Sequence, residues 1–334
     1  MIKVAIVGLG GIGNNHARCY RTNPHTQLVA VCDIDKERAD KAAAEHGCPA
    51  FYSVPDLLDA DVTFDAASVC TAGEENGGDH FEPTMQLLEA GIPVLGEKPI
   101  SNRLASAEKM IALARDKHLP YAINLNHRFT PAARQARQWL DDGRLGPVNF
   151  VNMFMWINNP NESSPHFHMR ALHPHSIDVM RYFGGEVKKV HAFFKKGDGR
   201  AIWSNVHVNM LFENGTLGHL MGSYDGGGPG TPWGLERCEV VGGEAKFVIE
   251  DACEKLVFTP RHNLQQETYD HPGNMKSFGD TFQSRIDAWV DDLRHKVAPD
   301  KVDGKAEDAL KAQQIIEAAI ASWETGTVVE LENT

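Results

Sequence analysis

Directly after Met1 the chain reads Ile2-Lys3-Val4-Ala5-Ile6-Val7-Gly8-Leu9-Gly10-Gly11-Ile12-Gly13, and this stretch decides the fold of its first half. Residues 2–7 are mostly apolar, which predicts a buried strand that runs straight into the pattern G-x-G-x-x-G. In this pattern Gly8 allows a tight turn, Gly10 lets a pyrophosphate approach the backbone, and Gly13 lets the next helix pack closely. Free N–H groups at the start of that helix attract phosphate. Five residues are therefore predicted to contact a dinucleotide: Gly8, Gly10, Gly11, Ile12 and Gly13.

A second strand, residues 28–32, ends at Asp33, which lies 25 residues after Gly8. A carboxylate here can accept both ribose hydroxyls of an adenosine and repels a 2′-phosphate, so the pattern favours NAD over NADP. The alternative is that Asp33 or Asp35 simply caps the helix expected at residues 36–46. The spacing favours Asp33 as the ribose ligand.

Two further segments follow buried strands of the first half. Residues 71–80 form a polar, glycine-rich loop, and Gly96-Glu97-Lys98-Pro99-Ile100 follows the strand at 92–95. Pro99 fixes its own φ and keeps Lys98 out of helical geometry, so the lysine is held at a strand-to-loop corner. Ligands of open α/β sheets bind at such corners. We therefore expect the remaining cofactor contacts here: Thr71, His80, Glu97 and Lys98.

Strands and helices alternate through the first half of the chain, which predicts a parallel, doubly wound sheet. After residue 147 strand-like runs follow one another, which predicts a mostly antiparallel sheet: 148–157, 187–195, 202–213, 216–224, 235–241 and 245–250. Helices are expected at 173–183, 277–296 and 303–325. The expected fold class is thus α/β, a doubly wound parallel sheet plus an α+β domain with a large, mostly antiparallel open sheet.

Length predicts two domains, because 334 residues exceed what one core usually serves. We expect an NAD-binding domain over residues 1–125. Residues 126–334 are expected to bind substrate and to mediate oligomerisation, and their last strand or helix could pack back on the first domain.

Composition excludes several classes of partner. The formal charge is −12 and there is no Lys/Arg cluster, which argues against nucleic acid and gives no reason for an anionic membrane. No apolar run approaches the roughly 20 residues of a bilayer span. The first residues resemble a strand more than a cleavable signal, so we expect a cytoplasmic protein. The six cysteines include no C-x-x-C pair, so neither a disulfide framework nor a cysteine zinc site is indicated.

Four histidines lie within ten residues: His166, His168, His173 and His175. Pro174 is typical of a first helical turn, which would start a helix here and put His175 and Asp178 on one face. Histidine can take a proton from a hydroxyl near neutral pH, as alcohol oxidation requires. Two alternatives remain. His175 could be a cap or an interdomain hydrogen bonder, or the cluster could bind zinc, although no matching carboxylate or cysteine set accompanies it.

Polar and aromatic side chains at the ends of two strands are candidates for substrate binding. Asn126 and Arg128 follow the strand at 121–125, and Trp156 ends the strand at 148–157. Such side chains suit a neutral polyol, whose hydroxyls form hydrogen bonds and whose CH face rests on an aromatic surface. The predicted substrate contacts are Asn126, Arg128, Trp156, His173 and Asp178. The glycine-rich segment 225–232 is expected to be a lid or a contact with a neighbouring subunit.

These motifs together resemble those of the Gfo/Idh/MocA oxidoreductases, which include glucose-fructose oxidoreductase and inositol dehydrogenase. The resemblance covers nearly the whole chain and rests on three features: the glycine loop with His16, the Glu97-Lys98-Pro99 signature, and His175 and Asp178 followed by Arg181-Tyr182-Phe183-Gly184. It implies a Rossmann domain and a C-terminal domain whose open sheet forms dimer or tetramer contacts. It also implies that Lys98 lies near the nicotinamide and the reacting hydroxyl, and that His175 is the acid/base.

The chain departs from the family pattern in two places. Many members carry an aspartate four residues before the histidine, where this chain has Ala171, so His173, Asp178 or the substrate would have to orient His175. The family's short Thr-Pro-Asn loop is here longer and acidic, over residues 71–79.

The sequence thus predicts an NAD-dependent dehydrogenase that acts on a secondary hydroxyl of a sugar, sugar derivative or cyclitol, with Lys98 and His175 at the reacting centre and no metal. Two alternatives are a non-catalytic NAD-binding sensor and an enzyme that retains NAD while it cleaves or rearranges a sugar by transient oxidation. The expected partners are a small sugar or polyol and further copies of the chain, as a homodimer or homotetramer.

Overall fold

The computed structural model describes residues 1–226, 235–252, 254–262, 265–275 and 278–331. The chain divides into two compact units, Met1–Leu125 with Phe282–Lys311 and Asn126–Thr281 with Ala312–Thr334. Each unit has its own sheet. That the first binds the cofactor, and that the second binds substrate and mediates oligomerisation, stays a prediction.

The first unit is built on a six-stranded sheet in which every pairing is parallel. Its strands, in spatial order, are β3 (Ala50–Phe51), β2 (Thr26–Cys32), β1 (Ile2–Val7), β4 (Ala66–Val69), β5 (Val94–Gly96) and β6 (Tyr121–Ile123). Because the strands are parallel, their carboxyl ends form one edge. The predicted doubly wound sheet is confirmed.

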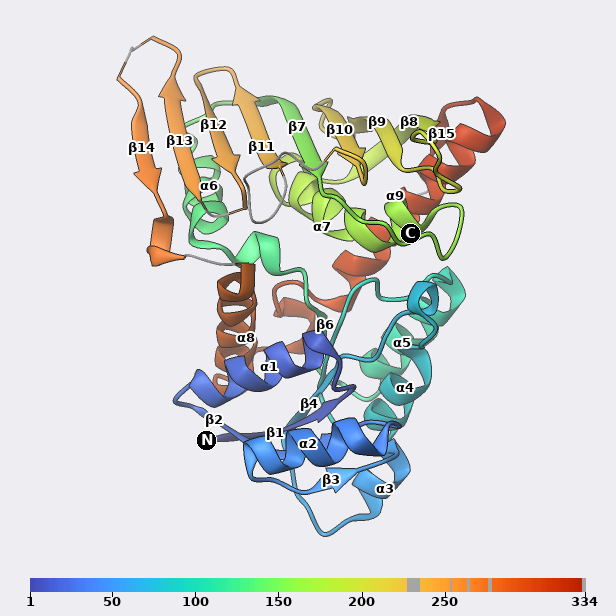
Figure 1. Cartoon of the computed structure of the whole chain (residues 1–334). Coiled ribbons are helices and arrows are strands. Elements are labelled where there is room, and N and C mark those ends of the chain that lie inside the picture. The colour runs from blue at the N-terminus through green and yellow to red at the C-terminus, as the bar shows by residue number, and fades with distance from the viewer. Residues whose placement is uncertain (227–234, 253, 263–264, 276–277, 332–334) are drawn as a thin grey trace. The chain divides into compact units, whose positions relative to one another are not determined.

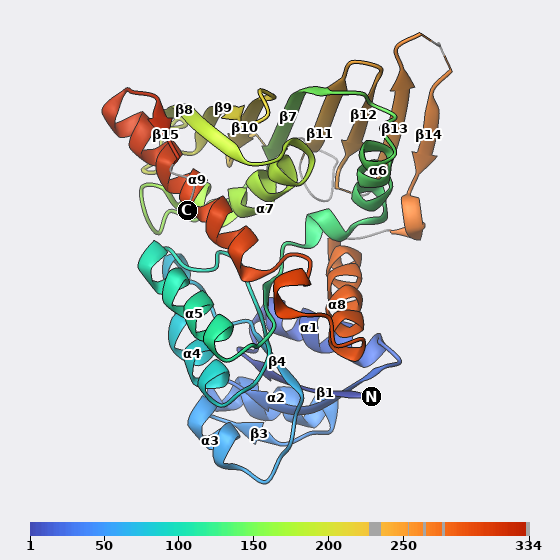
Figure 2. The same ribbon diagram turned by 180° about the vertical axis from the view of Figure 1, so that it is seen from behind.

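Helices cover both faces of this sheet (Figures 1 and 2). One face packs against α1 (Gly11–Thr22), α2 (Lys36–His46) and α8 (Phe278–Arg294), and the other against α3 (Val54–Asp59), α4 (Phe81–Glu89) and α5 (Leu104–Asp116). Alternate residues of β1 enter the two cores, with Val4 and Ile6 on one face and Ala5 and Val7 on the other. A strand buried on both faces reads as a continuous apolar run, as this one does.

The second unit contains a nine-stranded, mostly antiparallel sheet, as predicted. Its strands, in spatial order, are β14 (Glu267–Asp270), β13 (Lys255–Pro260), β12 (Ala245–Glu250), β11 (Leu235–Gly242), β7 (Val148–Trp156), β10 (Leu217–Ser223), β9 (Asn205–Phe212), β8 (Val187–Lys195) and β15 (Val329–Glu330). Only β7 and β10 pair in parallel among the described strands. Three of these strands, β13, β14 and β15, were not predicted from the sequence.

One face of the second sheet packs on α6 (Pro131–Asp141), α7 (Phe167–Gly184) and the second half of α9 (Ala306–Thr325) (Figures 1 and 2). The other face carries no helix of the described residues. Phe150, Phe193 and Leu217 point to this open face and are 45%, 58% and 50% exposed. Phe150 and Leu217 are direct neighbours across β7 and β10.

The prediction that Pro174 starts a helix is wrong, because α7 begins at Phe167 and Pro174 lies inside it. A proline inside a helix removes one hydrogen bond and costs about 3 kcal/mol. Phe167 and Met169, in the turns before Pro174, are buried in the core. Burying each such side chain stabilises the fold by about 1.5–3 kcal/mol. Their combined burial offsets the proline, so the helix continues through it.

No helix in the described part of the chain is both long and apolar enough to cross a bilayer. The segment 225–232, predicted to be a lid or subunit contact, lies outside the described residues from 227 onward.

Candidate active site

The glycine loop between β1 and α1 has two closely packed glycines and two open ones. Gly8 has φ +92°, and a Cβ there would lie 2.5 Å from the backbone N of Thr71. A Cβ on Gly13 would lie 1.8 Å from the Gly8 carbonyl oxygen. A Cβ on Gly10 or Gly11 would meet nothing within 4 Å, and no side chain caps the first N–H groups of α1. The loop therefore fits a pyrophosphate, which needs close backbone approach and free N–H donors.

A cavity of about 730 Å³ adjoins the open glycines and runs between α1 and α2. Four cationic side chains contribute to its lining: Arg18, Arg21, Arg38 and Lys41. Positive charge beside a helix N-terminus suits the phosphates of a dinucleotide.

The structure separates the roles of the two aspartates after β2. Asp35 is the N-cap of α2, and its carboxylate accepts the N–H of Arg38 at 3.2 Å. Asp33 instead faces the glycine loop, because its Oδ2 accepts the N–H of Leu9 at 2.7 Å. The Arg38 guanidinium lies 3.4 Å from Asp33 and 3.3 Å from Asp35. Capping thus falls to Asp35, which leaves Asp33 at the loop where a ribose ligand is predicted.

Lys98 lies just after the carboxyl end of β5, and the Lys98–Pro99 bond is cis. Burial lowers the pKa of Lys98, and the charge of Glu97 partly offsets this. Burial also raises the pKa of Glu97, but the hydrogen bonds from His16 and Asn124 and the charge of Lys98 bring that pKa below its ordinary value. The corner therefore holds a carboxylate beside a lysine whose pKa lies below its ordinary value.

The Glu97 carboxylate is bound on both of its oxygens. His16 Nε2 lies 3.0 Å from Oε1, Asn124 Nδ2 donates to Oε1 at 2.5 Å, and the Lys98 N–H donates to Oε2 at 3.2 Å. Glu97 was predicted to contact the cofactor. That stays a prediction, and the structure gives this carboxylate partners inside the first unit.

The loop after β4 is tied to the same corner. Thr71 Oγ1 donates to the Asp79 carbonyl at 2.6 Å, while His80 Nδ1 and Nε2 each lie 2.8 Å from a carbonyl oxygen, of Pro99 and Thr71 respectively. Glu75, buried in the acidic part of the loop, accepts a bond from Asn102 at 2.8 Å. The side chains of Thr71 and His80, both predicted cofactor contacts, thus hold the loop to the Lys98 corner.

In the second unit, the predicted substrate residues Arg128 and Asp178 form a buried pair with each other. Arg128 Nε donates to Asp178 Oδ2 at 2.7 Å, and Nη2 donates to Oδ1. The pair joins the short 3₁₀ helix η2 (Asn126–Phe129) to α7. Asp178 therefore binds an arginine, and its role in orienting His175 stays a prediction.

His175 stacks on His127. Their ring centroids are 4.3 Å apart and the planes are inclined by 26°. His127 Nδ1 lies 2.7 Å from Glu236 Oε1, on β11. Ala171, at the position of the missing aspartate, packs against the apolar core. Glu236 was not predicted from the sequence, because it lies 109 residues after His127 and no local pattern in its strand indicates the contact.

The other three histidines of the cluster contact other side chains. His173 is fully buried, with Nδ1 3.0 Å from Ser176 Oγ and Nε2 3.0 Å from His168 Nε2. Burial lowers the pKa of His173 well below its ordinary value and that of His168 to about 3. His166 Nε2 lies 3.2 Å from Glu324 Oε1. Within the described ranges, no three His, Cys, Asp or Glu side chains form a group that could hold a metal.

Two predicted substrate residues remain. Asn126 is buried and donates to Thr281 Oγ1 at 2.6 Å. Trp156 ends β7, and its indole N–H is buried with no hydrogen-bond partner among the described residues. An indole N–H usually finds a partner when buried, so Trp156 is the better candidate for a ligand contact.

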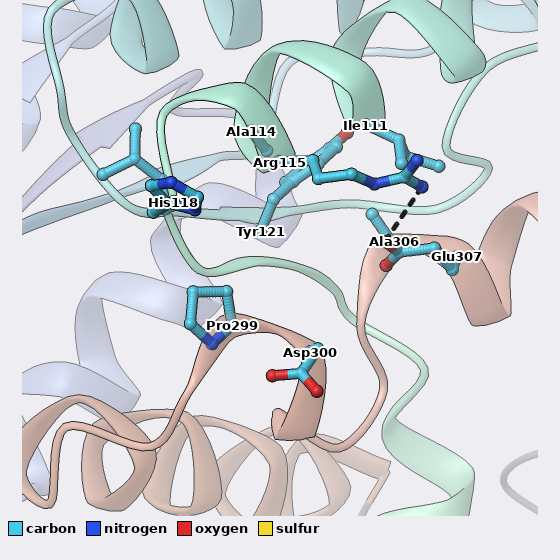
Figure 3. Close-up of a pocket in the computed structure, with 10 residues that line it drawn as sticks. Ile111, Ala114, Arg115, His118, Tyr121, Pro299, Asp300, Ala306 and Glu307 are labelled. Atoms are coloured by element: carbon cyan, nitrogen blue, oxygen red, sulfur yellow. Dashed lines mark ion pairs between the residues drawn. The ribbon is translucent and has the colours of Figure 1, made fainter.

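A second cavity, of about 230 Å³, lies in the first unit between the end of α5 and the segment before α9 (Figure 3). Arg115 and Glu307, both on its wall, form an ion pair at 3.9 Å. Tyr121 lines it and is the first residue of β6. The cavity therefore adjoins the amino end of that strand, away from the edge that carries the glycine loop and Lys98.

The fold and the glycine loop define an α/β protein that binds a dinucleotide. Residues 2–125 match the oxidoreductase family with an NAD-binding Rossmann fold, and residues 133–248 match the Gfo/Idh/MocA C-terminal domain. The chain therefore belongs to the Gfo/Idh/MocA oxidoreductases, and its N-terminal part is an NAD-binding Rossmann fold. The predicted family, the oxidoreductase class and the NAD cofactor are confirmed.

Similar proteins include several sugar and cyclitol dehydrogenases. The chain is 32% identical to D-glucoside 3-dehydrogenase of Escherichia coli over 44% of its own length, and it spans only 41% of that protein. It is 26% identical to inositol 2-dehydrogenase 1 of Saccharopolyspora erythraea, over 99% of this chain and 96% of the relative. Levoglucosan dehydrogenase, solved with NADH and levoglucosan, shares the fold with a TM-score of 0.88 at 18% identity, covering 99% of this chain and 100% of that one.

Proposed function

We propose that this protein oxidises a secondary hydroxyl of a sugar, sugar derivative or cyclitol, or reduces the corresponding ketone. The observation that carries the proposal is the Lys98 corner, where a lysine of lowered pKa stands beside an ionised glutamate at the carboxyl edge of the parallel sheet. Opposite charges this well placed at a ligand-binding edge are typical of catalytic groups.

The cofactor side of the site fits NAD. Gly10, Gly11 and Ile12 offer an open helix N-terminus to the pyrophosphate, and Asp33 faces the loop where the adenosine ribose would lie. Arg38, which could receive the 2′-phosphate of NADP, is instead shared between two carboxylates. Bound NAD supplies the hydride acceptor.

Lys98 and His175 divide the remaining chemistry. Lys98, held at the carboxyl edge, would stabilise negative charge on the substrate oxygen. His175 would accept the hydroxyl proton, because an imidazole can change its protonation state near neutral pH. Each effect is worth roughly two to four powers of ten in rate.

The substrate class follows from the relatives and from the polar side chains of the second unit. Relatives that match nearly the whole chain are named for D-apiose and for inositol, which are polyhydroxylated and uncharged. The buried indole N–H of Trp156 suits such a hydroxyl.

The test mixes purified protein with NAD and a panel of sugars and cyclitols and follows the absorbance of reduced nicotinamide. Net reduction with at least one of them is expected. Product without net reduction would instead support an enzyme that retains NAD during cleavage or rearrangement. Tight NAD binding with neither result would support a sensor and contradict the proposal.

We propose in addition that the open face of the second sheet forms a homodimer or homotetramer contact. Its exposed Phe150, Phe193 and Leu217 give an apolar surface that a monomer would leave in water. Light scattering on the wild type should give a dimer or tetramer. Phe193→Glu with Leu217→Glu should give a monomer, and unchanged mass would contradict this contact.

A further inference from the structure

Five buried polar side chains form one connected network behind the Lys98 corner. Besides its bond to Glu97, His16 places Nδ1 3.2 Å from Ser68 Oγ, and Tyr20 Oη lies 2.8 Å from the same Ser68 oxygen. Asn124 completes the set through Glu97. All five lie in the first unit and are at most 5% exposed.

One arrangement of protons satisfies the chain of bonds. Tyr20 donates to Ser68, Ser68 donates to His16 Nδ1, and the remaining proton on His16 Nε2 is donated to the Glu97 carboxylate. Burial raises the pKa of Tyr20, which keeps its phenol a donor. In this arrangement Glu97 is ionised and accepts donors only, as a carboxylate must.

The network joins the helix of the glycine loop to three strand ends. His16 and Tyr20 lie on α1, three and seven residues after Gly13, while Ser68 is on β4 and Glu97 and Asn124 follow β5 and β6 directly. Backbone hydrogen bonds also fix Glu97 and Asn124. The Glu97 N–H donates to the Val69 carbonyl at 2.9 Å, and the Asn124 N–H donates to the Gly96 carbonyl at 2.8 Å. A buried carboxylate bound on both oxygens is fixed in position.

We propose that Glu97, held by His16 and Asn124, is a positioning residue that serves as the fixed counter-ion of Lys98 and keeps that lysine charged at the carboxyl edge of the sheet. This rests on the proposed function only in its consequence for catalysis. Burial without a counter-charge would drive the lysine to its neutral form, in which it could not stabilise a substrate oxyanion.

The other titratable groups packed around the corner do not replace Glu97. From α4 and β4 come His80, bound to backbone carbonyls, and Cys70, whose thiol pKa is raised by burial. From α8 comes Arg285, a cation, whose Nε donates to the Ile123 carbonyl at 3.2 Å. The carboxylate of Glu75 binds Asn102 in the neighbouring loop. Glu97 is the anion adjacent to Lys98 in sequence and the one whose charge acts on it.

The decisive experiment measures the charge of Lys98 without any substrate. Whole protein is treated with trace acetic anhydride across a pH series, and mass spectrometry reads acetylation of the peptide that contains Lys98. Only the neutral amine reacts, so the midpoint reports its ionisation. Glu97→Gln should lower the midpoint by roughly one pH unit or more, because an opposite charge within about 4–6 Å shifts a pKa by 1–3 units.

Two variants separate charge from structure. Glu97→Asp keeps the charge and should restore most of the midpoint, even if it weakens the bond to His16. Tyr20→Phe removes the far end of the network, and the Lys98 midpoint should stay unchanged. The proposal is overturned if Glu97→Gln leaves the midpoint where it is, or if Tyr20→Phe lowers it equally, since that would indicate general loosening.

Activity gives a second readout. If a substrate is found, the alkaline limit of turnover should move to lower pH in Glu97→Gln and return in Glu97→Asp. If no sugar is oxidised, the proposed function fails while the acetylation series still decides the role of Glu97.

Discussion

The two predicted catalytic residues are held in contrasting ways. Lys98 follows a parallel strand, and its neighbour Glu97 is fixed by side chains from α1 and from the end of β6. His175 lies inside a long helix, and its ring rests on His127. A carboxylate thus accompanies the lysine, whereas an aromatic ring accompanies the histidine.

This contrast indicates where a sequence motif is enough to predict the surroundings of a residue. Parallel strands bring their carboxyl ends to one edge, so residues far apart in sequence converge there by topology alone. In the second unit, the neighbours of His175 depend on how a helix packs on a mixed sheet. The carboxylate Asp178, on the same helix, is turned to Arg128.

The largest effect on turnover is expected when Lys98 loses its charged side chain. Lys98→Ala should reduce turnover by about 10³-fold, because the substrate oxyanion loses its electrostatic partner. The affinity for NAD, measured by nicotinamide fluorescence, should change only a few-fold, since the glycine loop is untouched. Near-normal turnover on an identified substrate would refute the assigned role.

The matching change in the second unit is His175→Asn. Because the proposed base is then missing, turnover should fall by about 10²–10³-fold. His127→Phe is the control, because it keeps a ring for stacking and removes the bond to Glu236. Its loss should be clearly smaller. Equal losses would mean that the stacked pair acts as one unit, which would change the comparison between the sites.

The buried Arg128–Asp178 pair should matter for stability more than for chemistry. Asp178→Asn removes the carboxylate charge that faces the buried Arg128 and should cost about 3–5 kcal/mol, measured by urea unfolding. The less deeply buried pair of Arg170 and Glu317, whose side chains are 23% and 24% exposed and which is bidentate at 2.8 Å, is the control. Arg170→Met should cost at most about 1 kcal/mol. A small cost for Asp178→Asn would mean that the pair does not hold η2 to α7.

Asp33 tests the cofactor edge of the first unit. Asp33→Asn removes a charged acceptor and should weaken NAD binding by roughly 10–100-fold, the equivalent of 1.5–3 kcal/mol. Arg38 then loses one of its two carboxylates, so the NADP to NAD affinity ratio should rise. Asp35→Asn keeps the helix cap and should have little effect on either. If both variants behave alike, Asp33 is not the ribose ligand.

The smallest effect concerns acids near His127. Burial raises the pKa of Asp251 from 3.8 to about 6, and Glu254 and Glu236 add to this. The folded state thus favours the protonated carboxyl, and this stabilisation is complete below about pH 4 and lost as pH rises through 6. Asp251→Asn suits the left-handed φ of +48° and should gain stability relative to wild type between these pH values in urea unfolding. A constant difference would show that the pKa is not raised.

The amino-acid sequence alone was enough to predict the parallel sheet, the glycine loop and the corner that carries Lys98. The apolar run of β1, the glycines that follow it and the proline after Lys98 act through local geometry, which a motif records directly. It also predicted the succession of strands in the second half, although not β13 to β15.

The residues that surround these motifs are apparent only in the three-dimensional structure. It extended α7 back through Pro174, since buried Phe167 and Met169 outweigh a missing hydrogen bond, and it assigned capping to Asp35. It also joined His16 to Glu97 across 81 residues and His127 to Glu236 across 109. Contacts between distant residues depend on packing in three dimensions, and no local pattern along the chain encodes which buried polar groups will meet.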